Sequence, residues 1–198
     1  MFISPQTAIE NGWIKRVDGA EIAADFIQPN AIDFTIDRVF TTNTAESGVF
    51  KVADVMVDGA VKTVKEFPKF FELEPAEDFD PKFDRVPLWS LYPRQSFDFL
   101  SDFYVEVPEG VAALLIVRST FNRAGVFVTS GLYDSGYKGN IGAALHNNGN
   151  TQAYVGKGTR VGQIIFVQSE SVGAYAGGYN QLAGELAAQH GTSSHGPH

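Results

Sequence analysis

The pattern of apolar and polar positions along the chain is typical of a protein built mainly from short strands. β-branched and aromatic residues gather in short runs, and Gly, Pro, Asp and Asn interrupt these runs at close intervals. Such a pattern predicts an all-β barrel or jelly roll. The runs that we expect to form strands are Phe34–Phe40, Val49–Val57, Val61–Phe67, Gln95–Phe99, Tyr104–Val107 and Ala112–Val117.

One short amphipathic helix is predicted near the N-terminus, over Gln6–Lys15. Ser4 precedes it as a capping residue, and Pro5 suits the first position of a helix because its missing N–H is not needed there. The apolar residues expected near one face of this helix are Ala8, Ile9 and Trp13.

Two segments are expected to lie outside the β core. Glu72–Pro93 is rich in proline and acidic residues, which predicts a long surface loop and not a metal site. Residues 181–198 are expected to form a short helix, Leu182–Gln189, and a flexible tail whose histidines bind no metal. A single domain is therefore expected over residues 1–180.

Composition and charge narrow the class of protein. A chain of 198 residues with 44% hydrophobic residues is long enough for one domain with its own core. A net charge of −8 without a run of Lys or Arg disfavours a nucleic-acid polymer as partner, although a local cluster can still hold a small anion. The absence of cysteine excludes thiol catalysis and thiolate metal sites. No apolar run suits a membrane span or a signal sequence, so the expected location is the cytoplasm, or the host cytoplasm for a viral protein.

The segment Ser130–Asn147, SGLYDSGYKGNIGAALHN, carries the most specific chemistry. Asp134 and the residues after it supply turn chemistry between two β-rich runs, which predicts a tight hairpin. Gly131 and Gly142 have no side chains, so their backbone N–H and C=O groups on facing strands are open to the edge of a flat ring. The segment therefore suggests a nucleotide pocket. The two strands of this hairpin are expected at Val126–Thr129 and Ile141–Leu145.

Four motifs resemble those of one superfamily, in its order. GLYDSGYKGNIG, residues 131–142, resembles the third motif of the trimeric dUTPases, which share a fold with the dCTP deaminases. Arg118–Arg123 resembles the RSxxxR segment of the deaminases, Gly158–Ile164 is similar to GxRIxQL, and Gln28–Phe34 is similar to QPxSxDL. The resemblance implies a mainly β fold, the distorted jelly roll of the dUTPase-like (β-clip) type with a short N-terminal helix.

The resemblance implies that Asp134 is catalytic. It would orient and deprotonate the water that hydrolyses a nucleoside triphosphate between the α and β phosphates. Outside such a motif, an Asp at a turn more often accepts a local hydrogen bond. By the same resemblance, the Tyr137 ring packs beneath the deoxyribose and excludes a ribose 2′-hydroxyl, while the backbone of Gly131 and Gly142 meets the base. Without it, Tyr137 would be a packing residue of the hairpin.

The same resemblance implies the phosphate contacts, a metal ion and an oligomer. Arg118, Ser119 and Gln163 match phosphate-binding positions, and Arg123 matches an arginine that reaches the phosphates from a neighbouring subunit. Arg118 and Ser119 are expected to open a short helix. Mg²⁺ is expected, held by the triphosphate and water and not by a cage of protein carboxylates. A homotrimer is implied, with each site built from more than one subunit.

Ala144 separates the two activities of the superfamily. Deaminases of this type carry a glutamate at the matching position as general acid and base, and alanine cannot transfer a proton. We therefore expect a dUTP diphosphatase that hydrolyses dUTP to dUMP and pyrophosphate. A dCTP deaminase, or a bifunctional deaminase and dUTPase, remains the alternative, because another group can replace the glutamate.

The C-terminal segment Tyr175–Asn180, YAGGYN, resembles the deaminase lid YxGKYQ. Tyr175 and Tyr179 are its expected substrate contacts, while Gly178 stands where a phosphate-binding lysine is expected. Ser130 and Thr129 can retune the main-chain recognition of the base in the hairpin, which leaves open a diphosphatase for a modified pyrimidine deoxynucleotide. An idle nucleotide-binding regulator and a structural jelly-roll protein are further alternatives, although the first need not keep Asp134 and the second does not explain the motifs.

Overall fold

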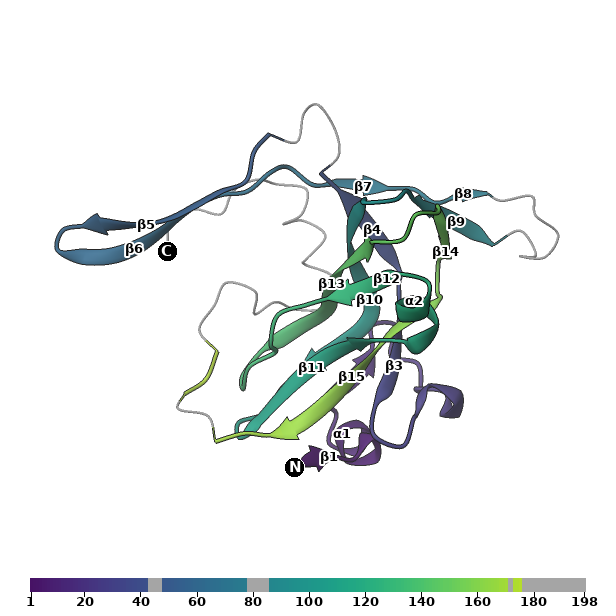
Figure 1. The fold of residues 1–198 in the computed structure, drawn as a ribbon. Coiled ribbons are helices and arrows are strands. Elements are labelled where there is room, and N and C mark those ends of the chain that lie inside the picture. The colour runs from purple at the N-terminus through teal and green to yellow at the C-terminus, as the bar shows by residue number, and fades with distance from the viewer. Residues whose placement is uncertain (43–47, 78–85, 171–172, 176–198) are drawn as a thin grey trace.

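A computed structural model describes residues 1–42, 48–77, 86–170 and 173–175 of the chain. The described chain is mostly β, as predicted, and its helices are short (Figure 1). Those helices are α1 (Pro5–Glu10), the 3-10 turn η1 (Ala24–Phe26) and α2 (Ser119–Arg123).

Two antiparallel sheets form the body of the molecule. Phe34 of one sheet stacks on Phe99 of the other, with ring centroids 6.3 Å apart, and both rings are buried. The core therefore lies between the sheets, which confirms the predicted fold class. The first sheet contains β1 (Phe2–Ile3), β3 (Ile32–Thr35), β11 (Val111–Val117) and β15 (Arg160–Gln168). The second contains β2 (Ile14–Arg16), β4 (Arg38–Thr41), β7 (Phe71–Leu73), β10 (Ser96–Glu106), β12 (Val126–Thr129) and β13 (Lys138–Asn147).

The N-terminal helix is shorter than predicted. The Thr7 N–H donates to the Ser4 side chain at 3.1 Å, so the predicted cap is confirmed. The helix ends at Glu10, because Gly12 adopts a left-handed backbone with φ 69° and breaks the helical path. Ile14, which we placed in the helix, instead begins β2 and is buried against β10.

The predicted strand Phe34–Phe40 is two strands. β3 pairs with β15 in the first sheet, whereas β4 pairs with β10 in the second. Between them, the Ile36 N–H donates to Thr159 O and the Asp37 N–H donates to Leu100 O, so the chain changes sheets here. The opposite correction applies to two other runs: Gln95–Phe99 and Tyr104–Val107 belong largely to one strand, β10, whose pairing with β13 shifts register between Leu100 and Tyr104.

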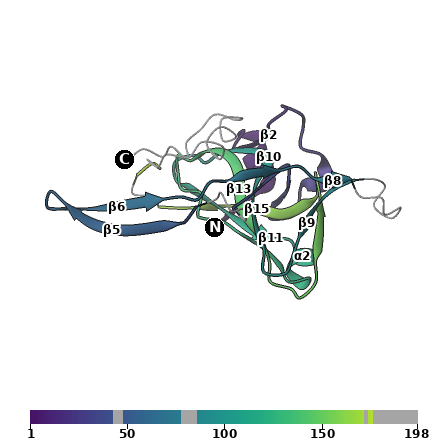
Figure 2. The same ribbon diagram turned by 90° about the horizontal axis from the view of Figure 1, so that it is seen from above.

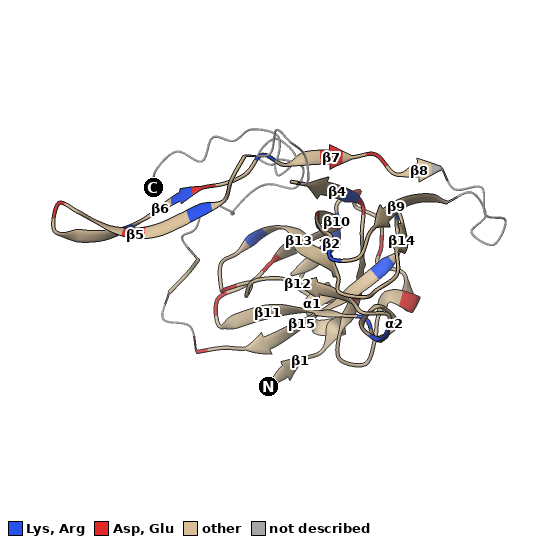
Figure 3. Ribbon diagram, turned by 45° about the horizontal axis from the view of Figure 1, so that its top comes forward, with Lys and Arg blue, Asp and Glu red and all other residues tan. Residues whose placement is uncertain are grey.

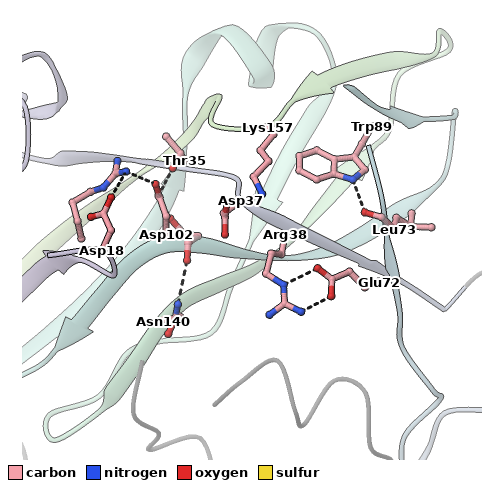
Figure 4. Close-up of polar contacts among 12 residues, drawn as sticks. Asp18, Thr35, Asp37, Arg38, Glu72, Leu73, Trp89, Asp102, Asn140 and Lys157 are labelled. Atoms are coloured by element: carbon pink, nitrogen blue, oxygen red, sulfur yellow. Dashed lines mark hydrogen bonds and ion pairs between the residues drawn. The ribbon is translucent and has the colours of Figure 1, made fainter. Parts of the chain in front are cut away.

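The predicted surface loop Glu72–Pro93 contains strands, so this expectation was wrong. Trp89 and Leu91 are buried, and the Trp89 indole N–H donates to Leu73 O at 2.8 Å (Figure 4). These apolar residues hold the segment against the core despite the prolines around them. Glu72 forms an ion pair with Arg38 of β4. A small third sheet contains β8 (Ala76–Glu77), β9 (Pro87–Leu91) and β14 (Ala153–Gly156).

A long hairpin extends away from the body (Figures 1 and 2). It consists of β5 (Lys51–Val57) and β6 (Ala60–Glu66), close to the predicted bounds. Asp58 and Gly59 form its turn with φ 52° and 80°, as suits a two-residue hairpin loop. Among the residues that the structure describes, no helix is long and apolar enough to cross a membrane. Exposed apolar side chains of the hairpin are Val52, Val55, Met56, Val61 and Val64.

Candidate functional site

The hairpin predicted to form the base pocket is present. β12 pairs with β13 from Val126↔Asn147 to Thr129↔Ala144. The predicted turn is confirmed, because the Tyr137 N–H donates to Asp134 O at 3.0 Å. The hairpin is not tight, however, since the chain leaves the ladder at Ser130 and returns to it only at Lys138. Gly131 lies in this connection and not on a strand facing Gly142, so that part of the prediction was wrong.

A tyrosine side chain meets the backbone of β13 where β12 ends. The Tyr133 hydroxyl donates to Gly142 O at 2.8 Å and accepts from the Gly142 N–H at 3.1 Å. Tyr133 is 6% exposed, and this burial raises the pKa of its hydroxyl to about 12. Its own backbone exchanges hydrogen bonds with Ala113 of β11. The sequence analysis did not single out Tyr133, although it lies next to Asp134 in the quoted motif.

Three tyrosine rings meet beside the turn. Tyr137 packs edge-on against Tyr133, with ring centroids 4.7 Å apart, and against Tyr175 at 5.7 Å. The Tyr175 N–H donates to Ser135 O at 2.6 Å, so the start of the lid-like segment lies on the turn. The structure therefore brings together two of the predicted substrate contacts, Tyr137 and Tyr175. The predicted contact Tyr179, with Gly178, lies outside the described residues.

A buried carboxylate joins two of the predicted phosphate contacts. Asp33 has no exposed surface, and Gln163 donates its side-chain N–H to Asp33 Oδ1 at 2.9 Å. Arg118 Nη2 lies 3.8 Å from Asp33 Oδ2, and Arg160 Nη1 lies 3.7 Å from the same atom. Arg118 and Gln163 thus share one anchor. Asp33 and Arg160 lie within the quoted motifs, but the sequence analysis assigned them no role, because only the folded structure brings these motifs into contact.

The predicted short helix after Arg118 is confirmed as α2. The Arg118 carbonyl accepts from the Asn122 N–H at 3.1 Å, so Arg118 is the N-cap that immediately precedes the helix. Ser119 and Arg123 lie on α2 and are exposed to solvent. Val117, the residue before Arg118, pairs with Gly162 of β15. Position 162 requires glycine, because a Cβ there would lie 2.2 Å from the Phe34 ring.

The two ends of the predicted site lie far apart within one chain. Tyr133, next to Asp134, pairs with Ala113 near the middle of β11. Arg118 follows the end of β11, five residues further along, and a strand advances about 3.3 Å per residue. The distance along the strand is therefore roughly 16 Å. One chain holds the exposed Asp134 next to the residue that pairs with Ala113, whereas Arg118 lies just beyond the end of β11.

A carboxyl group lies beside Ala144, on the neighbouring strand. Asp98 of β10 pairs directly with Ala144, and directly opposed residues place their side chains on the same face of a sheet. Burial raises the pKa of the Asp98 carboxyl to about 6. Asp98 lies far from Ala144 along the chain, so the sequence alone does not indicate that the two residues are neighbours. On the same face, His146 forms hydrogen bonds with Ser96 and Thr129.

Basic residues are spread over several elements of the described chain (Figure 3). Within residues 1–42, 48–77, 86–170 and 173–175, no group of three or more His, Cys, Asp or Glu side chains is placed to hold a metal ion. Basic residues on different elements include Lys51 of β5, Lys62 of β6, Arg123 of α2, Lys138 of β13 and Arg160 of β15.

Comparisons with known proteins agree with the motifs. A sequence profile of the dCTP deaminase-like family matches residues 101–169. The chain is 28% identical over 157 residues to a probable deoxyuridine 5′-triphosphate nucleotidohydrolase of Methanothermobacter thermautotrophicus, covering 79% of this chain and 89% of that protein. It is 29% identical over 168 residues to a protein of the same name from Methanopyrus kandleri, covering 81% and 92%. It is 24% identical over 161 residues to a dCTP deaminase of Acidianus ambivalens, covering 81% and 79%.

The fold matches as well. The crystal structure of 2′-deoxycytidine 5′-triphosphate deaminase from Agrobacterium tumefaciens superposes with a TM-score of 0.56 at 14% identity, covering 83% of this chain. The chain spans about half of that deaminase, 48% of its length. The chain therefore shares the mainly β fold of this deaminase. In its motifs, its profile match and these relatives, the chain is similar to the dUTPase and dCTP deaminase superfamily.

Proposed function

We propose that the protein is a dUTP diphosphatase, which converts dUTP to dUMP and pyrophosphate. The observation that carries this proposal is the buried Asp33 carboxylate, which contacts both Arg118 and Gln163. A guanidinium and an amide that share one anchor form a suitable group of donors for phosphate oxygens. The two archaeal relatives named as dUTP nucleotidohydrolases support uracil as the base.

In the proposed reaction, Asp134 accepts a proton from a water molecule whose oxygen attacks the α-phosphorus. The bond from this phosphorus to the oxygen bridging the α and β phosphates breaks, and pyrophosphate leaves with the electron pair. Arg118, Ser119 and Gln163 bind phosphate oxygens, and the Arg118 guanidinium offsets the charge that develops on them. Mg²⁺ bound to the triphosphate would supply further positive charge, held by phosphate oxygens and water.

The deoxyribose is proposed to lie against Tyr137. Tyr137 is 9% exposed and is covered in part by Tyr175, which comes from the lid-like segment. A sugar that packs on this ring would be enclosed by Tyr175, and Tyr179 would contact the substrate from the same segment. Enclosure by such a segment excludes water other than the attacking one.

We also propose a homotrimer with shared sites. Asp134 and Arg118 lie beside different parts of β11, roughly 16 Å apart along the strand. Because a second chain can bring Arg118 and Arg123 to the Asp134 of the first, assembly would complete each site. The exposure of Ser119, Arg123 and Asp134 leaves these side chains available for such a shared site.

A dCTP deaminase is the second candidate, and one observation favours it. Asp98 places a carboxyl group beside Ala144, where the superfamily's deaminases carry a glutamate. Its raised pKa suits a group that takes up and gives off a proton near neutral pH. Asp98 belongs to the adjacent strand, however, so its carboxyl group approaches the hairpin from a different position than a residue-144 side chain.

Separate incubations with Mg²⁺ and dUTP, dCTP, dTTP or UTP distinguish these functions when nucleotides, pyrophosphate and ammonia are resolved. The proposed function requires dUMP and pyrophosphate from dUTP. Ammonia from dCTP would identify a deaminase instead. If none of the four nucleotides gives a product, both the diphosphatase and the deaminase functions are contradicted. That result would favour a modified pyrimidine nucleotide as substrate, or a binding role.

A further inference from the structure

We propose that Tyr133 blocks recognition of the base at this site by occupying the backbone edge that a pyrimidine would use. This inference rests on the proposed function, and the motif resemblance implies that a base would bind at the backbone of Gly142. The Tyr133 hydroxyl donates to Gly142 O at 2.8 Å and accepts from the Gly142 N–H at 3.1 Å. One phenolic oxygen therefore satisfies both groups of this residue.

The edge at Gly142 would otherwise be open. In an antiparallel ladder, the N–H and C=O of one residue point toward the same neighbouring strand. Those of Gly142 both bond the Tyr133 hydroxyl, so they point away from β10 and toward the path that β12 would take if it did not end at Thr129. A flat ring with an adjacent donor and acceptor, such as the N3–H and a carbonyl oxygen of uracil, would fit this gap. It would need the same two hydrogen bonds that Tyr133 makes.

Tyr133 is held firmly in this position. Its ring is 6% exposed and packs edge-on against Tyr137, and its backbone is tied to Ala113 by hydrogen bonds of 2.9 and 3.0 Å. Moving the side chain would expose a buried aromatic ring and break two hydrogen bonds. A base can therefore pair with Gly142 only at the cost of these interactions, so the base contributes little to nucleotide binding in the unaltered protein.

Binding of deoxyuridine, which carries no phosphate, tests this directly. In a ligand-detected NMR titration of the full chain, Tyr133→Val is expected to bind deoxyuridine at least about tenfold more tightly than the unaltered chain, because both Gly142 groups become available. Tyr154→Val is the matched control, since Tyr154 is an exposed tyrosine of β14, and it is expected to leave the affinity unchanged. Equal affinity of the unaltered chain and Tyr133→Val would overturn the inference.

A second variant keeps the inference testable if Tyr133→Val does not fold. Tyr133→Phe keeps the buried ring but removes the hydroxyl, so the Gly142 amide loses its acceptor and is expected to exchange its hydrogen at least about fivefold faster. An unchanged exchange rate would overturn the inference.

Neither measurement uses a phosphorylated ligand, and neither depends on catalytic turnover. If no nucleotide is hydrolysed but Tyr133→Val gains deoxyuridine binding, the proposed function fails and the role of Tyr133 stands. If dUTP is hydrolysed but neither variant responds, the role of Tyr133 fails and the proposed function stands.

Discussion

Gln163 donates its side-chain N–H to the buried carboxylate of Asp33 at 2.9 Å, and this contact ties two motifs that lie far apart in the sequence. The same carboxylate faces the guanidinium groups of Arg118 and Arg160. In the proposed function, Asp33 is a positioning residue for the phosphate-binding side chains Arg118 and Gln163. Its negative charge also keeps two arginines together that would otherwise repel each other.

Asp33→Asn is expected to weaken binding of a non-hydrolysable dUTP analogue by about tenfold, because Arg118 loses the charge that orients it while Gln163 keeps an acceptor. Titration calorimetry measures the change, and Arg118→Lys should not rescue it. Asp37→Asn is the matched control, since Asp37 pairs with Lys157 at 3.2 Å on a partly exposed surface (Figure 4). Equal losses in both variants would contradict a specific role for Asp33.

The proposal that each site is shared between two subunits can be tested by complementation. Asp134→Asn and Arg118→Ala homo-oligomers are each expected to be inactive on dUTP. After mixed refolding in equal amounts, each site draws Asp134 and Arg118 from different subunits, so about a quarter of the sites regain both residues by chance. Recovery of up to about a quarter of the activity supports shared sites. No recovery from a mixture that forms mixed oligomers would show that one chain supplies both residues.

Asp98 gives the protein a pH-dependent stability. Its folded-state pKa of about 6 exceeds the ordinary value of 3.8, so the folded protein holds this proton more tightly than the unfolded chain. The contribution is favourable below about pH 4 and is lost as the pH rises to about 6. The upper bound of this loss is about 3 kcal/mol, and partial exposure reduces it. Urea denaturation between pH 4 and 7 should show this slope, and Asp98→Asn should remove it. A slope unchanged in the variant would assign it to other groups.

Ala144→Glu is not expected to create efficient deamination. The new carboxylate would lie directly opposite Asp98, and two neighbouring carboxylates disfavour each other's ionised form. The Tyr133 hydroxyl also occupies the backbone groups of Gly142 at which a cytosine is expected to bind. Ammonia release from dCTP by Ala144→Glu, measured beside Ala144→Gln, checks this. Sustained release by the glutamate variant alone would show that residue 144 by itself limits the chemistry.

Much of the fold could be predicted from local patterns, because β-rich runs and turn residues determine the structure of their own short segments. The hairpin around Asp58 and Gly59 and the helix after Arg118 are examples. Ile14 and Trp89 show where local signals fail. Ile14 lies in a helix-like pattern but pairs as a strand with β10, and Trp89 lies in a proline-rich acidic segment but is buried. In both cases long-range packing decides the structure.

In the candidate site, too, some features could be predicted from local sequence and others depend on long-range contacts. Motif resemblance identified Arg118 and Gln163, but the carboxylate that joins them became visible only in the fold. Likewise, Gly142 was predicted to offer an open backbone edge, and no local pattern indicates that the Tyr133 hydroxyl reaches it. Both features depend on contacts that the local sequence pattern does not indicate.

The most direct test of dUTP hydrolysis compares the unaltered protein with Asp134→Asn. The unaltered protein is expected to release dUMP and pyrophosphate from dUTP with Mg²⁺. Asp134→Asn should lower turnover by about 10²- to 10⁴-fold, the range for loss of a general base, while binding of a non-hydrolysable dUTP analogue stays unchanged. Unchanged turnover in Asp134→Asn, or no dUMP from the unaltered protein, would contradict the proposed function.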